Sequence, residues 1–129
     1  MTQIEMKART KQFALRVIKL VESLPNSKTA NVIGNQLLRS GTSVGANYRA
    51  ACRAKSTADF INKLAIVEEE ADESMYWIEL LVESKQIKQS LVENLHNEND
   101  EILSIVVSAI KTTKEKRNPK SEFPNPKSI

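Results

Sequence analysis

The side chains best suited to catalysis or metal binding in this 129-residue chain are its only histidine and its only cysteine. Glu93 and His96 have the Glu-x-x-His spacing of carboxylate-bridged di-iron bundles, in which both residues project inward to share a pair of metal ions. Such a site needs a second Glu-x-x-His and inward carboxylates from other helices. Because His96 has no second histidine to join it, a surface or hydrogen-bonded histidine is favoured over a metal ligand.

Cys52 has no recognisable partner of the kind that activates a catalytic thiol. It is better explained as a small core residue near Arg49 and Arg53 than as a nucleophile. The sequence also has no recognisable glycine-rich phosphate loop and no catalytic triad. We therefore expect no enzymatic activity, no metal or other cofactor and no small-molecule substrate.

A second group of polar residues occupies positions where a helical seam should be apolar. Polar side chains in a seam need hydrogen-bonding partners, so we expect the residues of one helix to meet those of the next in a layer that fixes their register. A buried Arg39 paired with Glu70 or Glu73 is favoured over an arginine that faces solvent and binds phosphate. An aromatic pair in the core or at a subunit interface is favoured over one that stacks on a base. The predicted polar seam consists of Gln36, Arg39, Ser40, Ser43 and Asn47, then Glu70, Glu73, Tyr76 and Trp77.

Charge is segregated along the chain, although the net charge is only +3. Residues 1–55 hold ten Lys and Arg against two acidic residues, a net +8, whereas residues 56–84 carry a net −7. Such asymmetry indicates basic surfaces for an anionic partner; the alternative is that these charges only keep the surface soluble. The candidate nucleic-acid-binding residues are Lys7, Arg9, Lys11, Arg16, Lys19, Arg49, Arg53, Lys55, Lys111, Lys114, Lys116 and Arg117.

The elements that must position these residues are four amphipathic helices. Apolar residues at spacings of three and four predict helices over about 6–24, 29–55, 57–84 and 91–116, with stripes that include Leu91 in the last helix and Ser74 and Asn99 among the apolar positions. Capping boxes beginning at Ser56 and Ser90 are expected to open the third and fourth helices. Short loops then favour an all-α fold, an up-down-up-down antiparallel four-helix bundle over residues 1–117, followed by a disordered, basic, proline-containing tail over 118–129.

Composition indicates a cytoplasmic protein. A single cysteine excludes a disulfide framework within one chain, and neither a secretory leader nor an apolar run long enough to cross a membrane is recognisable. More apolar residues lie off the central stripes than one bundle core absorbs, which favours lateral packing into a closed ring. Those residues are Ile18, Val21, Leu38, Tyr48, Leu80 and Val107.

The run QLLRSGTSVGAN, followed by ADFINKLAIVEEEADESMYWIELL, resembles the four-helix-bundle family of the 23S ribosomal-RNA intervening-sequence protein. That family's pattern is Q-[LM]-x-R-S-x-x-S-[IV]-x-x-N, then D/E-F and an E-x-x-Y/W-L region. The matching positions are Gln36, Arg39, Ser40, Ser43, Val44 and Asn47, then Asp59-Phe60, then Glu73, Tyr76 and Trp77, within a resemblance that spans about residues 8–112.

The chain departs from the pattern after Asn47, where many members have an acidic residue and Gly and this sequence has Tyr48 and Arg49. The resemblance implies a homopentameric ring of bundles with no established enzymatic activity, related to the accessory protein of diversity-generating retroelements, which works with a reverse transcriptase on RNA. We therefore expect a homo-oligomeric adaptor that binds structured RNA or an RNA-acting protein through basic surfaces. The alternative is a structural or protein-interaction bundle with no nucleic-acid partner.

Overall fold

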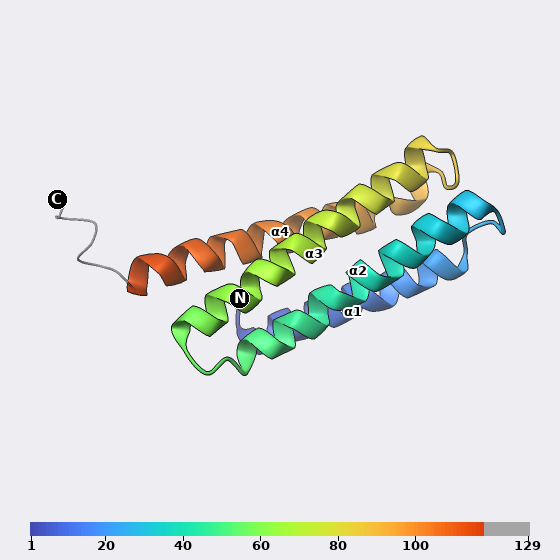
Figure 1. The fold of residues 1–129 in the computed structure, drawn as a ribbon. Helices are drawn as coiled ribbons and strands as arrows, with labels where there is room; N and C mark the ends of the chain where they lie inside the picture. The colour runs from blue at the N-terminus through green and yellow to red at the C-terminus, as the bar shows by residue number, and fades with distance from the viewer. Residues whose placement is uncertain (118–129) are drawn as a thin grey trace.

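Four helices lie side by side in the computed structural model, which describes residues 1–117 (Figure 1). They are α1 (Gln3–Glu22), α2 (Lys28–Cys52), α3 (Thr57–Glu83) and α4 (Gln89–Arg117), and the described part of the chain contains no strand. The prediction of an all-helical bundle of four helices is confirmed. The predicted tail over 118–129 lies outside the described residues.

Local capping sets where the helices begin. The Thr2 side chain accepts from the Glu5 amide at 3.1 Å while the Glu5 carboxylate accepts from the Thr2 amide at 2.8 Å, so α1 begins three residues before the predicted start at Met6. α3 begins as predicted after Ser56, whose hydroxyl accepts from the Asp59 amide at 3.1 Å. The Asp59 carboxylate, however, accepts from the amide of Lys55.

The start of α4 differs from the prediction. The helix begins at Gln89, so Ser90 lies within its first turn and the predicted capping box from Ser90 to Glu93 is wrong. The connection from α3 instead turns at Lys85, whose φ of 65° lies in the left-handed region. With this register Val92 is buried and Leu91, predicted to lie in the core, is 71% exposed.

The core consists of one apolar stripe from each helix. Most predicted positions are buried, among them Phe13, Val17, Leu37, Val44, Leu64, Val67, Ile78, Leu81, Ile102 and Val106. Tyr48 was expected among the surplus apolar residues, but it is only 7% exposed and belongs to this core. Each such large side chain withdrawn from water contributes about 1.5–3 kcal/mol of transfer free energy.

Glycine allows α1 and α2 to pack closely. A Cβ added at Gly41 would lie 2.8 and 2.9 Å from the two Cγ atoms of Val17, and one added at Gly45 would lie 3.3 Å from the carbonyl oxygen of Thr10. The two glycines therefore offset their poor helix propensity, about 1 kcal/mol each relative to Ala, by permitting this contact. Each helix packs against its neighbours in sequence, and α1 also contacts α4, although less extensively than the other neighbouring helices contact each other.

Candidate nucleic-acid interface

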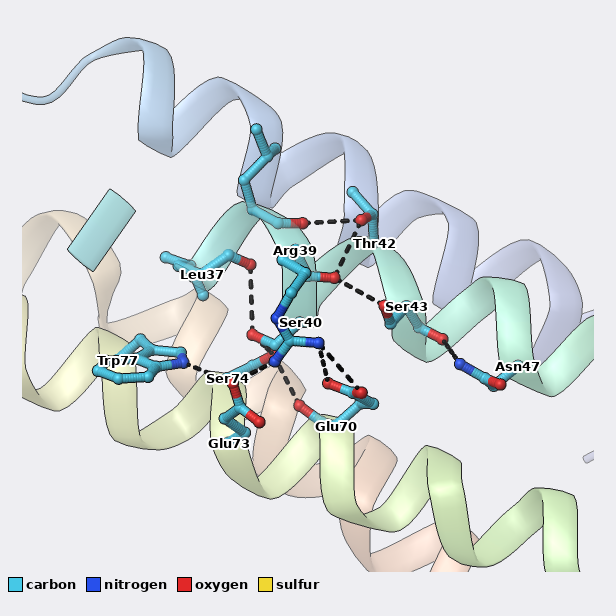
Figure 2. A network of polar contacts seen from close by, with 11 residues as sticks. Leu37, Arg39, Ser40, Thr42, Ser43, Asn47, Glu70, Glu73, Ser74 and Trp77 are labelled. Carbon is cyan, nitrogen blue, oxygen red and sulfur yellow. Dashed lines mark hydrogen bonds and ion pairs between the residues drawn. The ribbon is translucent and has the colours of Figure 1, made fainter. Parts of the chain in front are cut away.

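A polar network joins the middle of α2 to the middle of α3, on the side of the bundle drawn in Figure 2. Arg39 donates from Nη1 to both Glu70 carboxylate oxygens at 3.2 Å and from Nη2 to Glu73. Trp77 donates from Nε1 to the same Glu73 at 3.0 Å. The predicted pairing of Arg39 with these two carboxylates is present, but the arginine side chain is 47% exposed, so the prediction that it is buried is wrong.

The part of the network that is fully buried lies one residue further along each helix. The Ser74 hydroxyl donates to the Ser40 hydroxyl at 2.8 Å, and neither residue is exposed to solvent. The sequence pattern places Ser74 in the apolar stripe of the third helix without assigning it a partner. A serine among apolar positions, like Ser40 on the preceding helix, was the feature that could have predicted this hydrogen bond. This pair supplies the buried polar contact that specifies the register of α2 against α3.

Three predicted members of the seam do not reach across to α3. Ser43 and Asn47 donate to main-chain oxygens of their own helix, at 2.8 and 2.9 Å, because short polar side chains can satisfy themselves on the preceding turn. Gln36 is exposed and takes no part in the network. On α3, Tyr76 is 54% exposed and makes an edge contact with the partly buried Trp77, 5.1 Å between ring centroids.

The α3 and α4 helices are joined by a buried amide. Asn99 has no exposed surface, and in the orientation that satisfies both of its polar groups it donates to the Ala71 carbonyl at 3.0 Å and accepts from the Met75 amide at 3.1 Å. The amide expected in the seam therefore contacts the α3 main chain rather than another side chain. Such a contact fixes the position of α4 along the α3 axis, because sliding one helix past the other would separate the buried Asn99 amide from both of its hydrogen-bond partners.

The Glu73 carboxylate carries a testable pH dependence. Hydrogen bonds from Trp77 and then Arg39 hold its pKa below the usual 4.5, so its contribution to stability is present above that pH and is lost as pH falls through the lowered pKa. We expect Glu73→Gln to reduce the free energy of unfolding at pH 7 by about 1 kcal/mol or less, as for other partly exposed pairs. Urea denaturation should show that the difference in free energy of unfolding between wild type and Glu73→Gln shrinks below pH 4.5. The control variant Glu69→Gln, at an exposed position, should have the same free energy of unfolding as wild type. A Glu73→Gln deficit that stays constant from pH 7 to pH 3 would contradict the assignment.

Arg9 is already paired with carboxylates inside the bundle. Its guanidinium donates to Glu98 at 2.6 and 2.7 Å and to Glu101 at 2.6 Å, which raises its pKa further and links α1 to α4. Two carboxylates therefore neutralise this arginine, which argues against the predicted role in binding an external anion. The contact instead closes the side of the bundle where the helices pack least.

Four of the predicted cations gather around one groove between α1 and α2. Lys7 and Lys11 come from one face of α1, four residues apart. Arg49 comes from the last turn of α2, and Arg53 is the residue that caps the end of that helix. The groove encloses about 580 Å³, and its floor is made of small residues, Ala8, Ala14, Thr42, Gly45 and Ala46. No carboxylate lines it, and none of the four cations takes part in an ion pair within residues 1–117. We name this feature the α1/α2 groove.

The remaining predicted cations lie elsewhere. Arg16 and Lys19 line a different groove, between α1 and α4. Lys55 borders a hollow beside Cys52 and Phe60 at the α2–α3 connection. The last turns of α4 expose Lys111, Lys114, Lys116 and Arg117. The sequence could not have divided the candidates in this way, because the division depends on which helices are neighbours.

The histidine and cysteine are placed apart. His96 lies 3.1 Å from the carboxylate of Glu79 on α3, and over residues 1–117 no cluster of three or more His, Cys, Asp or Glu side chains could hold a metal ion. Cys52 is partly buried beside Tyr48, whose pKa is raised to about 12 by burial and by this cysteine. None of the helices described is long and apolar enough to span a membrane.

Comparison with known proteins identifies relatives over most of the chain. The sequence model of the 23S rRNA-intervening sequence protein family matches residues 2–108. A crystal structure from Bacteroides thetaiotaomicron VPI-5482, described as a protein with unknown function from the S23 ribosomal protein family, is 42% identical. The match covers 86% of this chain and 99% of that chain, with a TM-score of 0.80. No curated protein matches the sequence.

Proposed function

We propose that this chain, which belongs to the 23S rRNA-intervening sequence protein family, is a non-enzymatic cytoplasmic adaptor that binds structured RNA along its phosphate backbone through the α1/α2 groove. The single observation that carries the proposal is the gathering of Lys7, Lys11, Arg49 and Arg53 around one concavity without a carboxylate. Clustered cations that lack internal counter-charges attract phosphates and release the counterions condensed on them.

The composition of the groove favours recognition of backbone rather than bases. It contains no aromatic side chain on which a base could stack, and Tyr76 and Trp77 belong to α3, outside the α1/α2 groove. Small residues at the floor, such as Ala46, let a polyanion approach the helix surfaces closely. Binding should therefore follow the shape and charge of a folded RNA and depend little on its sequence.

We further propose that the bundle, in up-down-up-down order, assembles into a homo-oligomeric ring, in number a pentamer as the family resemblance implies. The connections α1–α2 and α2–α3 lie at opposite ends of the molecule in Figure 1, as that order requires. Large exposed apolar side chains on the outer faces of all four helices are suited to lateral contacts: Leu15, Val32, Ile66, Tyr76 and Val107. A ring would repeat the α1/α2 groove and so turn a modest single-site affinity into strong multivalent binding.

The experiment is a fluorescence anisotropy titration of the full chain against a labelled RNA hairpin at several salt concentrations. Four phosphate contacts per groove predict that log K falls against log salt with a slope of about −3 to −4. Undetectable affinity at about 50 mM salt would reject RNA binding. It would favour the alternative function, a structural or protein-interaction bundle without a nucleic-acid partner.

A further inference from the structure

A second groove, distinct from the α1/α2 groove, lies between the end of α1 and the beginning of α4. It encloses about 520 Å³. A neighbouring hollow of about 970 Å³ at the α3–α4 connection shares Ser23, Ile87 and Leu91 with it, so the two form one continuous depression. We name this depression the α1/α4 groove.

The floor of the α1/α4 groove is apolar and recessed. Leu20 and Leu95 are only 9% and 6% exposed, and Ile87 is partly buried against the core. Leu91 stands at the edge with 71% of its surface exposed. A single exposed leucine is common on a protein surface, but here it borders a recessed apolar floor, so the two together could contact one apolar face of a partner.

The rim of the same groove is cationic. Arg16 and Lys19 line it from α1, and Lys85 and Lys88 line it from the α3–α4 connection. No carboxylate lines either part of the depression, and these four side chains enter no ion pair among the described residues. The cations at the rim therefore have no internal counter-charge and would attract a negatively charged partner.

We propose that the α1/α4 groove docks an amphipathic helix of another protein, with leucine-like side chains on one face and carboxylates along its flanks. The apolar side chains would cover Leu91 and the recessed floor, and the flanking carboxylates would face Arg16, Lys19, Lys85 and Lys88. Such helix-in-groove binding depends on a few apolar anchors at helical spacing, while the rim charges set specificity and association rate.

The shape and composition of the site favour such a helix over two other anionic partners, a phosphate backbone and a lipid bilayer. A phosphate backbone would leave Leu20 and Leu95 without a complementary surface. A flat lipid bilayer would contact Leu91 at the edge but would leave the floor between α1 and α4 uncovered. This inference does not rest on RNA binding, since the two grooves have no residue in common.

The probe is a labelled synthetic helix of about 18 residues, five turns, with leucines at i, i+3, i+4 and i+7 and glutamates beside them. Anisotropy against the full chain should show binding at least about tenfold tighter than for a scrambled peptide of equal composition. Leu91→Glu should weaken binding about tenfold or more, because an exposed apolar anchor is replaced by a charge. Arg16→Glu with Lys19→Glu should weaken it and reduce its salt dependence.

Matched controls separate the two sites. Lys11→Glu with Arg49→Glu should leave peptide affinity unchanged, and Leu91→Glu should leave RNA affinity unchanged. The inference is overturned if the scrambled peptide binds equally well or if Leu91→Glu has no effect. It is also overturned if wild type binds phosphatidylserine vesicles through Leu91 while ignoring the peptide, or if Leu91→Glu lowers the particle mass measured by light scattering, which would assign the groove to a subunit contact.

Discussion

Replacing Lys11 and Arg49 together by glutamate is expected to weaken binding of the full chain to an RNA hairpin by about a hundredfold or more at low salt, close to 2.7 kcal/mol. The two substitutions remove one cation from each side of the α1/α2 groove and add two charges that repel phosphate. Because each phosphate contact contributes about one unit to the salt dependence, the slope of log K against log salt should also fall by about two. Both quantities come from the same anisotropy titration.

The control must change net charge by the same amount elsewhere. Lys28→Glu with Lys88→Glu does so, since Lys28 is exposed at the start of α2 and Lys88 lies at the α3–α4 connection, outside the α1/α2 groove. This variant should lose less than about fivefold, from the change in overall field alone. Equal losses in the two variants would mean that net charge, and not the groove, attracts the RNA. Circular dichroism should show the same helix content in both, because all four positions are exposed.

Gly41→Val is expected to destabilise the protein by about 3 kcal/mol, near the upper end of the cost of overpacking a core. An added Cβ at this position would already lie under 3.0 Å from both Cγ atoms of Val17, a fully buried β-branched side chain that is stiff about χ1. The two helices must therefore separate, which also opens the contact at Gly45. Urea denaturation followed by circular dichroism measures the change in free energy of unfolding.

Alanine at two glycines separates crowding from helix propensity. Both Gly34→Ala and Gly41→Ala should gain up to about 1 kcal/mol of helix propensity. At Gly34 the nearest atom is the Cδ1 tip of Leu24 at 3.0 Å, which can rotate away, so the gain should remain. At Gly41 the gain in helix propensity should be cancelled or reversed, because the added Cβ would crowd the two Cγ atoms of Val17. If the two alanine variants were equally stable, close packing of α1 against α2 would not be the reason for glycine at position 41.

Helical periodicity was sufficient to predict the number, type and approximate bounds of the elements. It was not sufficient at the start of α4, where Leu91 and Val92 are adjacent and both apolar, and the structure buries Val92 and exposes Leu91. Ser43 and Asn47 show a related limit, because a polar side chain in a seam can satisfy itself on its own helix. Sequence spacing cannot distinguish these outcomes from contact with a neighbour.

The candidate site was only partly predictable. The spacing of four residues within each pair, Lys7 with Lys11 and Arg49 with Arg53, was present in the sequence. That the pairs line one groove depends on the packing of α1 against α2, and that Arg9 is neutralised depends on the packing of α1 against α4. Charge counting alone treated all of these residues as equivalent.

Lysine acetylation mapped by mass spectrometry, with and without a bound hairpin, tests most directly whether the α1/α2 groove holds the RNA. Lys7 and Lys11 should become protected when RNA is present, while Lys28 and Lys88 should react equally in both samples. Unchanged modification of Lys7 and Lys11 under conditions where the hairpin is bound would contradict the assignment.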